Sequence, residues 1–152
     1  MKIVPLLIAL SLTAGCNKVH WVDNGPSVAV GERFFAELKQ AHAESVSAFY
    51  SREFQAEHNK DWPELLAGLQ QRFGPVTSVT LLESKVVPVN QVGCTLLRYK
   101  VNRGVFTTNE NLLLRPEHAS GPTIIGHELF RLDTNQRIAA GLSVRESSIH
   151  IP

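Results

Sequence analysis

Apolar residues recur three or four positions apart in the first half of the chain, which is the spacing of one face of a helix. The pattern begins at Gly31 and predicts two short helices with a break over residues 42–44. The apolar positions that define them are Phe34, Phe35, Leu38 and Ala41 in the first group and Val46, Phe49 and Tyr50 in the second.

A third helix is predicted by its start and stop residues. Asp61 can cap the first turn, Pro63 suits that turn, and Glu64 follows Asp61 at the spacing of a capping box. Gly74 and the proline after it end the helix, because glycine accepts a left-handed conformation and proline cannot continue a helix. The apolar stripe consists of Leu65, Leu66, Leu69 and Phe73.

Beyond the third helix, apolar residues alternate with polar ones, which is the period of β-strands. The second and third of these strands form a predicted hairpin around Arg103 and Gly104, and Pro88 marks the end or an exposed edge of the first. The pattern of residues 135–152 is weak and is left unassigned. The predicted strands cover residues 76–89, 94–102, 105–115 and 123–132. Helices followed by an antiparallel sheet predict a single α+β domain.

The N-terminus has the layout of a secretory signal. One positive residue, Lys2, precedes an apolar run from Ile3 to Leu12, and small residues then lead to Cys16. The run is shorter than the ~20 apolar residues that a membrane-spanning helix needs. The sequence therefore predicts a chain that is exported.

Composition and charge exclude several classes of function. The 152 residues are 43% hydrophobic and 19% charged, which is typical of an ordinary globular domain. Fifteen Lys and Arg residues against fourteen Asp and Glu, with no basic block, argue against nucleic-acid binding. Two cysteines are too few for a disulfide scaffold or a structural zinc site, and no cofactor motif is present. Cys94 lies in an apolar stretch and is interpreted as a small buried hydrophobe.

The end of the signal resembles the lipobox of bacterial lipoproteins. Ala14 and Gly15 precede Cys16, while Thr13 stands where that family more often has leucine. The resemblance implies cleavage before Cys16 and attachment of lipid to its sulfur. The lack of Asp at position 17, where Asn17 stands, favours sorting to the outer membrane in a diderm host.

These expectations divide the chain into four parts. Residues 1–15 are the lipoprotein signal peptide, and residues 16–27 are the lipidated N-terminus and tether. Residues 28–135 form the α+β domain, facing the periplasm, and residues 136–152 are a C-terminal tail. The membrane, reached through lipid on Cys16, is the expected partner, together with a protein of the cell envelope.

A second resemblance covers about residues 30 to 133. Trp62 opens the third helix, Gly74 stops it, and the strand sequences of residues 110–114 and 125–129 follow. These features resemble small envelope domains of the nuclear transport factor 2-like, or cystatin-like, superfamily. The resemblance implies helices packed on a curved antiparallel sheet, but it carries no activity, because one fold serves many functions.

Pairing the strands about their predicted turns places four polar residues on the helix-facing side of the sheet. The turn at Arg103 and Gly104 sets Tyr99 opposite Thr108. The following turn sets Glu110 opposite Arg131 and Leu114 opposite His127. The opposite face carries polar residues and is expected to meet solvent: Arg98, Lys100, Asn102, Asn109, Asn111, Arg115 and Glu128. A one-residue slip would exchange the two faces.

The residues Tyr99, Glu110, His127 and Arg131 are therefore a candidate pocket with three interpretations. Glu110 and Arg131 can form a structural cross-strand ion pair, with the other two hydrogen-bonded or at the rim. The four can instead bind a small ligand with a polar head, or carry out acid–base chemistry. Arg131 argues against a base, because a guanidinium stabilises the charged carboxylate.

The sequence as a whole favours a non-enzymatic binding or assembly module. The first alternative is a small-molecule-binding or isomerase-like cone using the four pocket residues, and the second is an interaction module that uses the outer face of the sheet or a strand edge. No metal site is expected. His127 and Glu128 begin like a zinc-protease motif, but Arg131 stands where the second histidine belongs.

Overall fold

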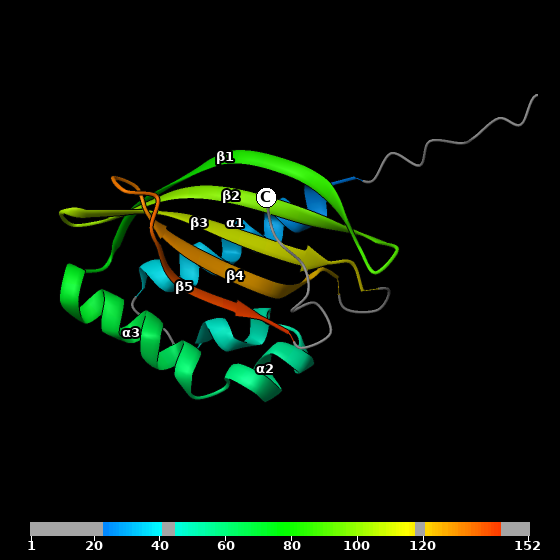
Figure 1. The fold of residues 1–152 in the computed structure, drawn as a ribbon, viewed down its shortest axis with the longest axis horizontal. Coiled ribbons are helices and arrows are strands. Elements are labelled where there is room, and N and C mark those ends of the chain that lie inside the picture. The colour runs from blue at the N-terminus through cyan, green and yellow to red at the C-terminus, as the bar shows by residue number, and fades with distance from the viewer. Residues whose placement is uncertain (1–22, 41–44, 118–120, 144–152) are drawn as a thin grey trace, which may run out of the picture.

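The computed structural model describes residues 23–40, 45–117 and 121–143. It is a single α+β domain in which three α-helices pack against a five-stranded antiparallel sheet (Figure 1). The signal segment, Cys16, the predicted break at residues 42–44 and residues 144–152 lie outside the described residues. The predicted fold class is therefore confirmed at the level of helices on an antiparallel sheet.

The first helix, α1 (Gly25–Lys39), begins six residues before the predicted start. Pro26 occupies its first turn, where a missing N–H costs nothing. This proline marks the start of the helix, which the spacing of apolar residues does not. The second predicted helix is a 3₁₀ segment, η1 (Ser45–Phe49), followed by α2 (Arg52–His58). Ser51 caps α2, because its hydroxyl accepts a hydrogen bond from the Phe54 N–H at 3.2 Å.

Helix α3 (Asp61–Phe73) has the predicted bounds but not the predicted cap. Asp61 lies inside the helix, and Lys60 is the N-cap residue, with no side-chain capping hydrogen bond, so the predicted capping box was wrong. Gly74 does end the helix, with φ 91° and ψ 171°, a region that side-chain-bearing residues rarely adopt.

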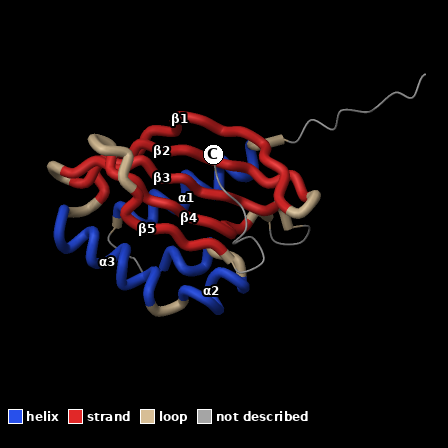
Figure 2. Tube along the Cα trace, viewed as in Figure 1, coloured by secondary structure: helices blue, strands red, loops and turns tan. Residues whose placement is uncertain are grey.

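The sheet consists of five strands that are neighbours in space in the order of the sequence. Figure 2 shows them as a continuous layer with the helices on one side. The fifth strand falls within the segment whose structure the pattern left unassigned. The bounds are β1 (Val76–Val89), β2 (Val92–Arg103), β3 (Phe106–Arg115), β4 (Thr123–Arg131) and β5 (Arg137–Leu142).

The strand register differs from the predicted one by two residues. Tyr99 pairs with Glu110 rather than Thr108, and Glu110 pairs with Leu129 rather than Arg131. The β2–β3 turn consists of Gly104 and Val105, one residue later than predicted, with φ 53° at Gly104. A shift of two residues preserves alternation, so the predicted assignment of residues to faces still holds.

The two faces of the sheet bury separate apolar clusters. The inner face packs against the helices, where Phe34, Leu38, Leu66 and Leu112 are at most 1% exposed. At one end of the outer face a second cluster contains Val89, Cys94, Leu96, Leu113 and Ile125. This outer face was expected to meet solvent, and the second cluster corrects that expectation at this end of the sheet. Cys94 is a buried member of the cluster, as predicted. No helix within the described ranges is long and apolar enough to cross a bilayer.

Candidate functional site

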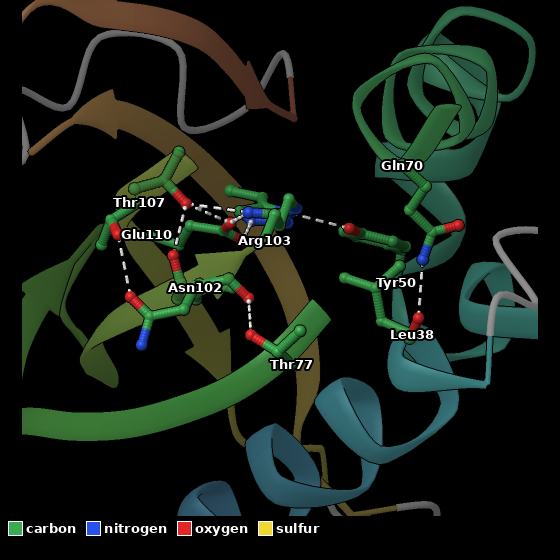
Figure 3. A network of polar contacts seen from close by, with 11 residues as sticks. Leu38, Tyr50, Gln70, Thr77, Asn102, Arg103, Thr107 and Glu110 are labelled. Carbon is green, nitrogen blue, oxygen red and sulfur yellow. Dashed lines mark hydrogen bonds and ion pairs between the residues drawn. The ribbon is translucent and has the colours of Figure 1, made fainter. Parts of the chain in front are cut away.

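A chain of buried polar side chains runs through the core between the sheet and the helices. It begins at the end of β2, crosses β3 and β4, and reaches the helical layer at Tyr50 and Trp62. Figure 3 shows Tyr50 pointing from the helical side towards the cluster around Arg103 and Glu110. Each member is at most 5% exposed: Arg103, Thr108, Glu110, His127, Tyr50 and Trp62.

The sheet end of this chain is an ion pair between Arg103 and Glu110. Both residues lie in the β2–β3 hairpin, and their side chains are 1% and 0% exposed. The Arg103 guanidinium donates to Glu110 Oε1 and, at 2.8 Å, to the hydroxyl of Thr108. Thr108 in turn donates to Glu110 Oε1 at 2.8 Å. The carboxylate is therefore neutralised and bonded within the hairpin itself.

The other oxygen of Glu110 connects the ion pair to the helices. His127 Nε2 lies 3.0 Å from Glu110 Oε2, and His127 Nδ1 lies 2.9 Å from the Tyr50 hydroxyl. A carboxylate only accepts, so a neutral imidazole with its proton on Nε2 satisfies both contacts, with Tyr50 donating to Nδ1. Tyr50 then accepts from Trp62 Nε1 at 2.9 Å. The donors of His127, Tyr50 and Trp62 thus each meet an acceptor, whereas Arg103 Nε has no hydrogen-bond partner among the described residues.

The network also fixes the charge state of its members. Burial alone raises the pKa of Glu110, but the charge of the Arg103 guanidinium, together with the hydrogen bond from His127, outweighs burial and lowers this pKa to about 2. Burial raises the pKa of Tyr50 well above its usual value. The network is therefore a fixed set with Glu110 ionised and Tyr50 protonated at neutral pH.

The structure brings together only part of the predicted pocket. Glu110 and His127 are bonded, and Tyr99 lies beside Glu110 on the inner face, with its hydroxyl unbonded among the described residues. Arg131 is not part of the group. Its side chain is 43% exposed and pairs with Asp133, its NH2 group lying 2.7 Å from the carboxylate. The predicted Glu110–Arg131 ion pair was wrong, because the register shift replaces Arg131 by Leu129 opposite Glu110.

Neither Glu110 nor His127 lines any of three hollows that border the described part of the chain. One of about 50 Å³ lies next to Tyr50, between α2 and α3. Another is a wide hollow along α3 at the end of the sheet, and Arg131 contributes to its wall. The four predicted residues thus do not meet in any of these three hollows.

The third cavity is a groove of about 690 Å³ on the outer face of the sheet. Its floor includes Arg98, Asn111 and Glu128, which are direct cross-strand neighbours on β2, β3 and β4. Asn111 and Glu128 are only 8% and 5% exposed, although both were expected to face solvent. Other residues that line the groove are Leu82, Glu83, Tyr99, Asn109, Phe130, Asn135 and Arg137.

Sequence reasoning missed Arg103, Thr108, Tyr50 and Trp62 as members of the buried network. Arg103 was placed in a turn, although it continues the alternate inward positions of Tyr99 and Val101. That alternation was the signal that could have identified it. Tyr50 and Trp62 carry no such signal, because their contact with His127 depends on how the helices pack.

A Glu–His–Tyr row resembles a proton relay in composition, but all three side chains are enclosed and saturated by one another. No group of three or more His, Cys, Asp or Glu side chains in the described ranges is placed to hold a metal ion. Comparison of the chain with protein-family models, curated proteins and solved structures found no match.

Proposed function

We propose that this chain is a lipid-anchored lipoprotein of the bacterial outer membrane, facing the periplasm, and that its domain is a non-enzymatic binding or assembly module. The anchor is lipid on Cys16, and the domain is of the nuclear transport factor 2-like kind. The lipobox resemblance of residues 13–16 supports the anchor, and the arrangement of helices on an antiparallel sheet is compatible with that superfamily.

The burial of the Glu110–His127 pair is the observation that carries the non-enzymatic part of the proposal. Both side chains are 0% exposed, and their polar atoms are bonded to neighbours inside the core. A general acid or base has to come within hydrogen-bond reach of its substrate. These two groups have no opening through which a substrate could reach them, so their arrangement favours a role in stability.

Chemical modification tests this interior directly. Diethyl pyrocarbonate reacts with accessible imidazoles, and the chain offers a matched pair in His127, which is 0% exposed, and His58, which is 26% exposed. Mass spectrometry after brief treatment of the native protein is expected to find His58 modified. We expect His127 to react at least ~10-fold more slowly, because it needs the core to open. Similar rates at the two histidines would instead indicate an interior that small molecules enter, and would favour the isomerase-like cone.

Removing the lipid attachment site tests the anchor. Cys16→Ser is expected to move the protein from the membrane fraction to the soluble periplasmic fraction, because the serine hydroxyl cannot form the thioether. Labelling with a palmitate analogue should mark the wild-type protein and not the variant. Cys94→Ser is the matched control. Cys94 lies in the core, so its replacement should leave the labelling unchanged. An unlabelled wild-type protein would contradict the anchor.

A further inference from the structure

We propose that the groove on the outer face of the sheet binds a neutral, hydroxyl-rich ligand of the oligosaccharide class. This inference gives the proposed binding module a ligand class and a site, and so rests on that proposed function. The site is separate from the buried network, because the groove lies on the other face of the same three strands.

The floor of the groove is a built polar surface. Glu83, Arg98, Asn111 and Glu128 follow one another directly across β1 to β4. Arg98 Nη1 is 3.0 Å from Glu83, and the Asn111 amide lies 3.4 Å from Glu128 Oε2. A polar row of this kind, spanning four strands, offers donors and acceptors at the repeat of the sheet, about 4.8 Å between strands.

Two acceptors in the groove have capacity left for a ligand. The Glu128 side chain is 6% exposed, and its two contacts, with Asn111 and Arg137, are long at 3.4 and 3.5 Å. A carboxylate can accept about four hydrogen bonds, and a buried one that is incompletely bonded is costly. Asn109 Oδ1 is buried and has no hydrogen-bond partner among the described residues. Both groups therefore favour a ligand that brings donors into the groove.

The charge of the groove favours a neutral ligand over an ion. Among the residues that line the groove, two carboxylates, Glu83 and Glu128, each lie beside one guanidinium group, that of Arg98 or Arg137. Lys85 also contacts Glu83, at 3.7 Å, but does not line the groove. The four charges cancel, so an anion or a cation gains little from the summed field. Hydroxyl groups both donate and accept, and they match a surface that presents amides and paired charges together.

Size and apolar surface agree with a sugar chain. The volume of about 690 Å³ lies inside the ~300–1,000 Å³ range of small-ligand sites. Leu82 and Phe130 add apolar surface to the walls, against which the C–H face of a sugar ring can be removed from water. The polar row then provides specificity, and the contact of the sugar ring with Leu82 and Phe130 provides part of the binding energy.

The test is titration of the full chain, purified in a polyoxyethylene detergent so that no sugar headgroup competes, with defined tetrasaccharides. Chitotetraose, cellotetraose and maltotetraose are the neutral probes, and tetragalacturonate and the chitosan tetramer are charged controls. We expect at least one neutral probe to bind with a Kd of about 1 mM or lower, and both charged probes more weakly. The side-chain amide NMR signals of Asn109 and Asn111 should shift as the probe saturates.

Two neighbouring asparagines provide matched variants. Asn109→Ala removes an acceptor that lines the groove, and we expect it to weaken binding about 10-fold. Asn102 lies on the same face but is engaged with Ser78 and Thr107 and does not line the groove, so Asn102→Ala should leave the Kd within about twofold. The melting temperature of each variant establishes that it is folded.

The possible outcomes separate this inference from the anchor. If no neutral probe binds, if a charged probe binds more tightly, or if Asn109→Ala and Asn102→Ala act alike, the oligosaccharide site is wrong. Labelling of Cys16 is independent of all three results. An acylated protein that binds no sugar would overturn the ligand class and leave the proposed lipoprotein in place.

Discussion

Replacing Glu110 by glutamine is expected to lower the free energy of unfolding by about 3–5 kcal/mol. The substitution keeps the size of the side chain but leaves the Arg103 guanidinium, 1% exposed, without its counter-charge. Arginine cannot lose its proton to escape this cost, because its guanidinium stays charged in proteins. Urea denaturation at pH 7, followed by far-UV circular dichroism, measures the change.

Replacing Arg103, the other member of the ion pair, should lower the free energy of unfolding by less. In Arg103→Met the carboxyl of Glu110 can take up a proton, and His127 remains as a hydrogen-bond partner. The double variant should therefore be less destabilised than the sum of the two single variants, with a coupling of at least ~1 kcal/mol. Additive effects would mean that the two charges do not interact in the folded protein.

The acid limb of the stability curve provides a second measurement of the same pair. The pKa of Glu110 is lowered to about 2 in the folded state, from a usual value of 4.5. Its contribution is thus present in full above pH 4.5 and is lost as the pH falls towards 2. The wild-type protein should lose stability over that interval more steeply than the Glu110→Gln variant.

Arg131 is the control for this prediction. It was the partner that sequence pairing gave to Glu110, but it lies in water beside Asp133. Arg131→Gln should leave the free energy of unfolding nearly unchanged, because an exposed ion pair contributes little. A loss in Arg131→Gln as large as that in Glu110→Gln would restore the predicted Glu110–Arg131 ion pair and contradict the structure.

The second large effect is expected at Gly31, in the middle of α1. Helix propensity alone predicts that Gly31→Ala stabilises by about 1 kcal/mol. The structure reverses the sign, because the new Cβ would overlap the Tyr99 hydroxyl and lie 3.1 Å from its ring. Tyr99 is 2% exposed and packs against the ring of Phe35. We expect a net loss of about 1–3 kcal/mol, measured by denaturant unfolding.

Two further variants isolate this contact. Gly68→Ala, within α3, meets no atom within 4 Å and should stabilise the protein as helix propensity predicts. Tyr99→Phe removes a hydroxyl that is unbonded among the described residues, so it should cost little and should rescue most of the loss in Gly31→Ala. If Gly31→Ala and Gly68→Ala changed the free energy of unfolding in the same direction, α1 would not lie against Tyr99 as described.

The sequence predicts the elements of this fold better than it predicts their pairing. β1 has the predicted bounds because strong local signals flank it, with Gly74 before it and a turn after it in which Asn90 and Gln91 have positive φ. β5 was left unassigned because its six residues include two alanines and a glycine, which carry little β signal. Pairing with β4 determines its structure.

The predicted pocket failed for a different physical reason. Alternation shows which face a residue occupies, but a two-residue slip leaves the faces unchanged and alters every cross-strand partner. The position of the turn decides between such registers. Gly104 is the second residue of the predicted turn but the first residue of the turn in the structure. A Cβ at Gly104 would lie 2.8 Å from the Phe73 carbonyl oxygen, a contact between distant segments that no local pattern contains.

The strand order has a consequence for how the sheet can assemble from the unfolded chain. Every strand pairs with the one synthesised just before it, so the sheet can grow by successive local steps with little loop entropy lost at each. Arg103 and Glu110 are seven residues apart, and their opposite charges meet within one such step. The costliest polar contact in the core can therefore assemble while it is still hydrated, and the helices then dock over charges that already neutralise each other.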